Sequence, residues 1–144
     1  MRLSGDRCEE RGDVLMKGMP PAPLETEEDL QLVKEYILLP VLLNVLERDM
    51  KALGTVKLKM DVVYARALHT AQDVITADLT SVRKQMRDRG IKVFEQQRTE
   101  LGMEARYLCR GYQHRFSMLW SLVKAELNQY LSKYLNVDLR SDGL

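Results

Sequence analysis

Cysteine is scarce in this chain, which contains only Cys8 and Cys109 and no Cys-x-x-Cys pair. Two cysteines, one of them in a polar N-terminal stretch, do not make a disulfide framework. Such scarcity is typical of proteins that fold in a reducing compartment. The first fifteen residues also lack the apolar core of a secretory signal. We therefore expect a cytoplasmic protein.

A long hydrophobic run is also missing. The most apolar stretch, residues 36–46, is interrupted by Pro40 and Asn44 and is flanked by charged residues. A membrane-spanning helix needs about 20 apolar residues. The stretch is therefore expected to form a buried helix, and no membrane partner is expected.

The motifs of common enzymes are absent as well. The sequence has no glycine-rich phosphate loop, no Gly-x-Ser-x-Gly elbow and no dinucleotide fingerprint. His69 and His114 are the only histidines, and neither has cysteine or carboxylate neighbours at the spacing of a zinc site. Cys109 lacks the adjacent base that a catalytic thiol needs. We therefore expect no enzyme, no cofactor and no metal site.

The 144 residues suffice for one domain. Residues 1–24 show no apolar periodicity and end in a proline-rich stretch, so they are predicted to be a disordered leader. A second interpretation stays open: translation begins at Met16 or Met19, because residues 9–13 can be encoded by a purine-rich run that resembles a ribosome-binding site. The helical domain is expected to cover 25–136, and residues 137–144 are expected to fray.

Two long helices are predicted in the first part of this domain. Thr26 begins a capping-box sequence, and the apolar pattern that follows runs to Leu53 before Gly54. Pro40 is expected to kink or split this helix. A second helix is predicted over residues 57–89, because its apolar residues recur at steps of three and four.

After Gly90 the pattern changes to alternation. Residues 91–97 and 103–110 are predicted to form a β-hairpin with a five-residue turn, in which Val93 faces Tyr107. A third helix is predicted over residues 113–136. The expected fold is mainly α: three long helices, the first kinked at a proline, with one β-hairpin (91–110) between the second and third helices.

Charge is unevenly distributed along the chain. Residues 25–61 contain eight acidic and five basic side chains, a net of −3, whereas residues 83–115 contain nine basic and four acidic, a net of +5. A basic hairpin beside a helix could contact phosphates in the way of a winged-helix wing. The other interpretation is a solvated face that pairs with the acidic first helix. The candidate contacts to nucleic acid or to an acidic partner are Arg83, Arg87, Lys92, Arg98, Arg106 and Arg110.

The predicted helices carry more apolar surface than three helices and a hairpin can cover. Large exposed apolar patches usually mark interfaces, and two-fold oligomers are the commonest. We therefore expect a non-enzymatic binding or regulatory protein that acts through helical surfaces as a homodimer, with an unknown protein partner. The alternative is a nucleic-acid-binding protein that uses the basic hairpin. The candidate oligomer interface comprises Leu38, Leu42, Val45, Trp120, Leu127 and Tyr134.

Four short segments carry a resemblance to a known group of proteins: Glu35-Tyr-Ile-Leu-Leu-Pro40, Leu46-Glu-Arg-Asp49, Ile91-Lys-Val-Phe94 and Cys109-Arg-Gly-Tyr112. The chain resembles short uncharacterised cytosolic proteins of spore-forming Gram-positive bacteria over residues 26–135. The resemblance implies a bacterial source and a cytoplasmic location. It implies no activity.

Overall fold

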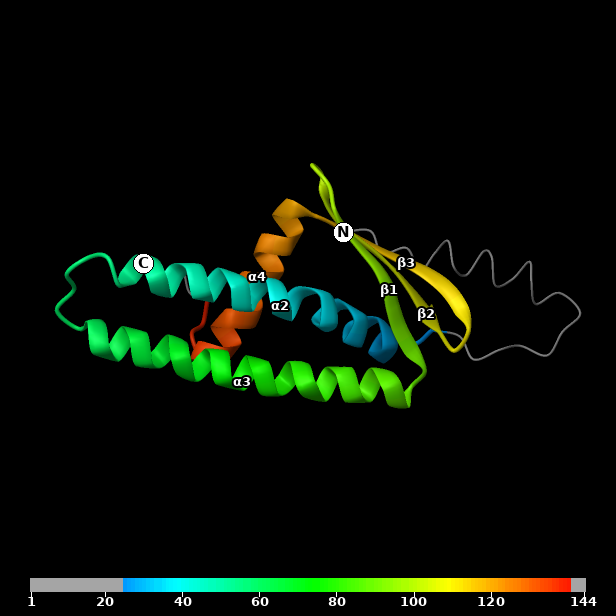
Figure 1. Ribbon diagram of the computed structural model, residues 1–144, viewed down its shortest axis with the longest axis horizontal. Helices are drawn as coiled ribbons and strands as arrows, with labels where there is room; N and C mark the ends of the chain where they lie inside the picture. Colours follow the sequence, from blue (N-terminus) through cyan, green and yellow to red (C-terminus); the bar gives the residue numbers. More distant parts are fainter. Residues whose placement is uncertain (1–24, 141–144) are drawn as a thin grey trace, which may run out of the picture.

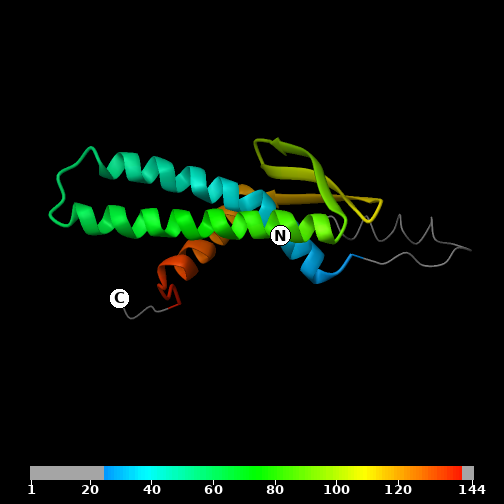
Figure 2. The same ribbon diagram turned by 60° about the horizontal axis from the view of Figure 1, so that its bottom comes forward.

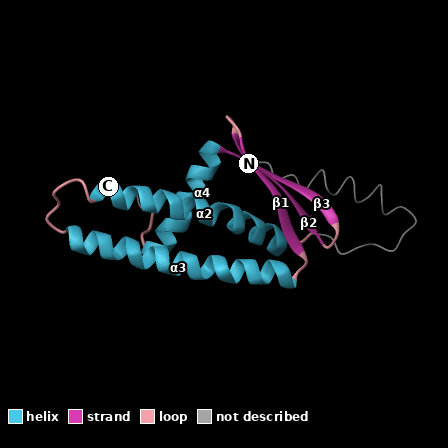
Figure 3. Cartoon of the chain, viewed as in Figure 1, coloured by secondary structure: helices cyan, strands magenta, loops and turns pink. Residues whose placement is uncertain are grey.

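A computed structural model describes residues 25–140 (Figure 1). The predicted leader with its alternative start sites, and the end of the predicted tail (141–144), lie outside the described residues. The described chain forms two long helices, a three-stranded sheet and a shorter C-terminal helix, in that order (Figure 3).

Helix α2 (Glu27–Leu53) begins as the sequence predicts. The hydroxyl of Thr26 accepts a hydrogen bond from the amide of Asp29, whose carboxylate accepts one from the amide of Thr26. This reciprocal pair is a capping box, and it satisfies two amides that a helix start leaves unpaired. The helix ends at Gly54, also as predicted. It runs unbroken through Pro40, so the predicted split does not occur.

Helix α3 (Asp61–Asp88) returns antiparallel to α2, and the two form a long helical hairpin (Figure 1). Its buried residues recur every three or four positions, which places them on one face. They pack against the buried face of α2 in a single core that also includes the sheet. The α3 residues in this core are Ile75, Leu79, Val82 and Met86.

The prediction of a single β-hairpin is wrong. Strands β1 (Ile91–Arg98), β2 (Gly102–Cys109) and β3 (Tyr112–Leu119) form one antiparallel sheet in the order β1-β2-β3. Residues 113–119, which were expected to begin the third helix, are therefore the third strand. The helix that follows, α4, starts only at Trp120 and ends at Leu135.

Two local features explain the third strand. Arg110 and Gly111 both have positive φ angles, 51° and 91°, and two such residues form the tight turns that join antiparallel strands. Beyond the turn, His114, Phe116 and Met118 are buried while the residues between them are not, which is the two-residue period of a half-buried strand. The helix predicted over residues 113–136 therefore begins too early.

The predicted pairing of β1 with β2 is confirmed at the start of β1, where Val93 faces Tyr107. A β-bulge between Val93 and Glu95 then shifts the pairing, so that Glu95 faces Arg106. Such a bulge adds one residue to a strand and increases its twist. It brings Glu95 to the outer face of the sheet, beside Arg106.

Helix α4 (Trp120–Leu135) packs against both helices of the hairpin and against strands β2 and β3. Turning the molecule shows that α4 crosses the hairpin at its middle, while the α2–α3 hairpin extends well past it (Figure 2). Asn136 ends the helix in a left-handed conformation with φ of 58°, which asparagine tolerates better than most residues. The outer half of the hairpin is therefore covered neither by the sheet nor by α4.

Candidate functional site

A buried ionic cluster joins the start of α2 to the sheet. Asp29, in the first turn of α2, is fully buried and lies 3.0 Å from the guanidinium of Arg89. A second guanidinium, that of Arg110 in the β2–β3 turn, lies 2.6 Å from the other carboxylate oxygen. Arg110 also donates to the carbonyl of Arg89. One carboxylate thus connects the beginning of α2, the end of α3 and the sheet.

The surroundings of Asp29 keep its carboxylate ionised. Burial by itself would raise the pKa, but hydrogen bonds from Arg110, from the backbone of Thr26 and from Arg89 outweigh it and hold the pKa well below its usual range. The same contacts raise the pKa values of both arginines. A carboxylate held in this way does not exchange protons near neutral pH, so the cluster is suited to fixing structure rather than to acid–base chemistry.

Beside this cluster lies a second polar group. Glu25 accepts a hydrogen bond from the hydroxyl of Tyr107, and its carboxylate lies 3.4 Å from Nδ1 of His114. The rings of Tyr107 and His114 are stacked with centroids 5.2 Å apart. Burial raises the pKa of the neighbouring Cys109 thiol to about 11, so this thiol stays protonated at neutral pH and is a poor nucleophile.

Local sequence patterns explain the positions of Asp29 and Arg89 separately. They do not indicate that these residues contact each other or Arg110. Asp29 is the fourth residue of the capping-box sequence that begins at Thr26, and Arg89 is the last residue of the predicted second helix. Arg89 and Asp29 are 60 positions apart, and Arg110 and Asp29 are 81 apart. No local pattern connects residues at such separations, so only the fold reveals the cluster.

The six candidate basic residues lie on α3, on strands β1 and β2 and in the β2–β3 turn. Arg110 points to Asp29, and Arg106 lies 3.6 Å from the carboxylate of Glu95 with its guanidinium over the ring of Phe94. The guanidinium of Arg83 lies over the ring of Tyr36, which is an ordinary cation–π contact. The exposed members of the set are Arg83, Arg87, Lys92, Arg98 and Arg106.

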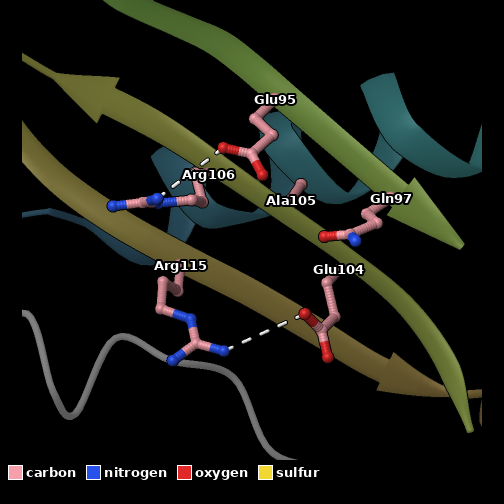
Figure 4. Close-up of a pocket in the computed structure, with 6 residues that line it drawn as sticks. All are labelled: Glu95, Gln97, Glu104, Ala105, Arg106 and Arg115. Atoms are coloured by element: carbon pink, nitrogen blue, oxygen red, sulfur yellow. Dashed lines mark ion pairs between the residues drawn. The ribbon is translucent and has the colours of Figure 1, made fainter. Parts of the chain in front are cut away.

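The outer face of the sheet carries a shallow hollow of about 390 Å³ (Figure 4). Two ion pairs line it: Arg106 with Glu95 at 3.6 Å and Arg115 with Glu104 at 4.0 Å. Its two cations are balanced by two carboxylates, so the hollow has no excess positive charge for a phosphate. This balance leaves the hollow itself without the excess positive charge that phosphate-driven binding of nucleic acid requires.

The candidate interface residues divide into three groups: buried, exposed and half-buried. Leu38 and Leu42 are buried in the core of the single chain, where they contact the rest of the fold. Val45 is exposed on α2. Trp120 is half-buried, and its indole nitrogen donates to the carbonyl of Thr99 at 2.8 Å. The remaining two, Leu127 and Tyr134, are half-buried on α4.

Two polar contacts show which side of the helical hairpin α4 covers. Lys34 of α2 lies 3.0 Å from the carboxylate of Glu126 on α4. The hydroxyl of Tyr134 on α4 donates to the carboxylate of Asp78 on α3 at 2.6 Å. Residues of α2 and α3 that share a helix face with Lys34 and Asp78 therefore lie on the α4 side of the hairpin.

An exposed apolar strip continues on that side beyond α4. Val45 lies eleven residues, or three turns, after Lys34, so these two residues share one face of α2. Val74 lies one turn before Asp78, so these two share one face of α3. Going back along α3 from Val74 by steps of four, three and four residues reaches Thr70, Ala67 and Val63, which are exposed and uncharged, while the charged Arg66 borders them. We call the resulting set the hairpin face: Val45, Val63, Ala67, Thr70 and Val74.

Comparison with known proteins identifies the family. The YhjD protein family matches residues 24–139 of the chain. The chain belongs to the YhjD family. A relative, the uncharacterized protein YhjD of Bacillus subtilis (strain 168), is 24% identical over 109 residues, which are 76% of this chain and 91% of that protein. No solved structure matches the chain significantly.

Membership of the YhjD family confirms the resemblance to uncharacterised proteins of Gram-positive bacteria. The matched span encloses the range over which the resemblance was seen. Between residues 25 and 140, no helix of this YhjD-family chain is long and apolar enough to cross a bilayer. The same described residues contain no group of three or more histidines, cysteines and carboxylates placed to hold a metal.

Proposed function

We propose that this YhjD-family protein is a non-enzymatic binding protein that acts through the hairpin face and pairs there with a second copy of itself. The observation that carries the proposal is the exposed, uncharged strip along α3, continuous with the half-buried edge of α4. Water-exposed apolar strips of this kind are covered in most proteins. A helical surface left open beside a packed helix offers a place for another helix.

Self-association suits the composition of the strip. Its members on α3 are uncharged, so two copies related by a two-fold axis would bring no like charges together among these residues themselves. Ala67 and Thr70 are small, which lets a second helix approach closely. Leu127 and Tyr134, which are half-buried on the adjoining α4, would gain cover from the same partner.

Two substitutions on α3 test the proposal. Val74→Glu places a charge on the hairpin face, whereas Thr76→Glu places the same charge two residues away, on nearly the opposite side of the helix. Both positions are exposed in the single chain, so neither substitution should impair folding. Sedimentation equilibrium should show a dimer for the wild type and for Thr76→Glu, and a monomer for Val74→Glu.

A wild-type protein that remains monomeric at high concentration would contradict the proposal. So would a Val74→Glu variant that associates as the wild type does. Circular dichroism on each variant shows that helix content is unchanged and that the mass differences reflect association.

Nucleic-acid binding through strands β1 and β2 has less support. Arg110 is engaged with buried Asp29, and Arg106 is paired with Glu95. Adding duplex DNA to the sedimentation experiment at low and high salt tests this alternative, because phosphate-driven binding weakens steeply with salt. A complex that forms at low salt and is lost in Arg98→Glu/Arg106→Glu would favour it.

A further inference from the structure

The connection between α2 and α3 forms the end of the molecule farthest from the sheet (Figures 1 and 2). Large apolar side chains are unusually exposed there. The exposed fractions are 53% for Val56, 54% for Met60 and 70% for Val62. Together with Lys51, Lys57 and Lys59 we call this group the hairpin tip. It is distinct from the hairpin face, which lies along one side of the helices.

The apolar side chains of the tip do not all line one surface. Val56 and Val62 line one hollow of about 230 Å³ between α2 and α3, whereas Met60, the residue that precedes α3, is exposed and does not line it. A flat protein partner would cover only one of these two places. A medium into which the end can be inserted would cover both.

Positive charge accompanies the apolar residues. Lys51, Lys57 and Lys59 are exposed, and no ion pair formed among residues 25–140 involves any of them. From residue 48 to residue 66 the chain has five basic and two acidic side chains, a net of +3, whereas the whole chain carries +1. The tip is therefore the place where a locally cationic surface coincides with exposed apolar side chains.

The fold separates this charge from the acidic part of the same helix. Averaged over residues 25–61 the sequence is acidic, but four of its eight acidic residues lie at the sheet end: Glu27, Glu28 and Asp29 in the first turn of α2 and Glu25 just before it. Helix α2 has 27 residues, which is about 40 Å at the rise of an α-helix. At physiological ionic strength a distance of about 40 Å is several screening lengths, so the tip acts as an independent cationic site.

We propose that the hairpin tip binds the surface of an anionic lipid bilayer. Val56, Met60 and Val62 enter the boundary between headgroups and acyl chains, while the three lysines meet the lipid phosphates. The long lysine side chains can reach headgroups while the apolar residues beside them are buried. Such contact is peripheral and needs no membrane-spanning helix. It therefore differs from a transmembrane span, which the short and interrupted apolar stretch of residues 36–46 argues against.

Other occupants fit the tip less well. A second copy would bring one set of lysines against another. A nucleic acid would satisfy the lysines but leave Val56 and Val62 in water. An acidic protein would have to enclose apolar side chains both in the hollow and outside it. The bilayer meets the charge and the apolar groups at once.

Flotation of the full-length protein with lipid vesicles tests the proposal. The wild type should float with vesicles of phosphatidylcholine and phosphatidylglycerol and should remain at the bottom with phosphatidylcholine alone. Lys57→Glu/Lys59→Glu should weaken binding by about tenfold or more, because each basic residue near an anionic surface contributes about a fivefold gain. Val56→Ser/Val62→Ser should weaken it comparably without changing the charge.

The matched control is Lys124→Glu/Lys133→Glu, which makes the same charge change at two exposed lysines of α4. This variant should float as the wild type does. Equal loss in the control would show that net charge rather than the tip is responsible and would overturn the proposal. Failure of the wild type to float with the anionic vesicles would also overturn it, including the case in which the protein binds an acidic polypeptide instead. Neither result depends on whether the hairpin face forms a dimer.

Discussion

The guanidinium of Arg110 lies 2.6 Å from the carboxylate of Asp29, although the two residues are 81 positions apart. This contact ties the β2–β3 turn to the first turn of α2, and Arg89 at the end of α3 completes it at 3.0 Å. Because Asp29 is fully buried, its charge depends on both arginines for compensation. These ion pairs hold α2, α3 and the sheet together at the end of the domain opposite the hairpin tip.

Replacing Asp29 should therefore be costly. Asp29→Asn leaves two guanidinium groups facing a neutral amide, and removing one member of a buried ion pair typically lowers the free energy of unfolding by about 3–5 kcal/mol. Asp88→Asn is the control, because its pair with Lys84 is exposed and such pairs contribute about 0–1 kcal/mol. Urea denaturation measures both. Equal effects of the two substitutions would contradict the structural role of Asp29.

The same carboxylate should make stability depend on pH in the acid range. Its pKa in the folded chain lies below the ordinary value of 3.8. A depressed carboxyl pKa stabilises the folded state at all pH values above the unfolded pKa, and this contribution is lost as the pH falls through the folded value. The wild type should therefore lose more unfolding free energy than Asp29→Asn between neutral pH and about pH 3. Parallel pH profiles for the two proteins would refute this assignment.

Cys109 should resist alkylation in the folded protein. It is buried, and its thiol pKa is raised to about 11, so little thiolate exists at neutral pH and little of it is accessible. In a Cys8→Ser background, labelling with iodoacetamide should be slow without denaturant and should become fast when urea unfolds the chain. Rapid labelling under native conditions would mean that the β2–β3 end of the sheet opens readily.

Gly102 should not tolerate a side chain. A Cβ atom at this position would lie 2.0 Å from the carbonyl oxygen of Met118 on β3, so Gly102→Ala must push the strands apart. Overpacking of this kind costs about 1–3 kcal/mol. Gly54→Ala is the matched control, because a Cβ there meets its nearest neighbour at 3.4 Å. Thermal unfolding should show a lower midpoint for Gly102→Ala alone.

Some of the fold could be predicted because its signals are local. Thr26 and Asp29 form a capping box within four residues, Gly54 ends the helix that Thr26 begins, and Val93 faces Tyr107 as the alternation required. Each of these depends on residues close in sequence or on a simple two-residue period. The third strand was missed because Leu119 and Trp120 follow Phe116 at the three- and four-residue steps of a helix.

The candidate surfaces were predicted less well, for a related reason. Val45 and Leu42 are three positions apart in the same apolar stretch, yet Leu42 is in the core and Val45 is exposed. Which of them α3 and α4 cover depends on how those helices cross α2. Likewise, the net charge of residues 25–61 does not distinguish the acidic first turn of α2 from the lysines of the hairpin tip.

The sequence by itself determined where the first helix begins and ends, the pairing of Val93 with Tyr107 and the absence of familiar catalytic motifs. Membership of the YhjD family agrees with the resemblance that the sequence showed. Only the tertiary structure decided that Asp29 meets Arg89 and Arg110, that residues 112–119 form a strand, and that one side and the tip of the helical hairpin are left uncovered. Helix caps and short turns are set by neighbouring residues, whereas burial and ion pairing between distant residues depend on the path of the whole chain.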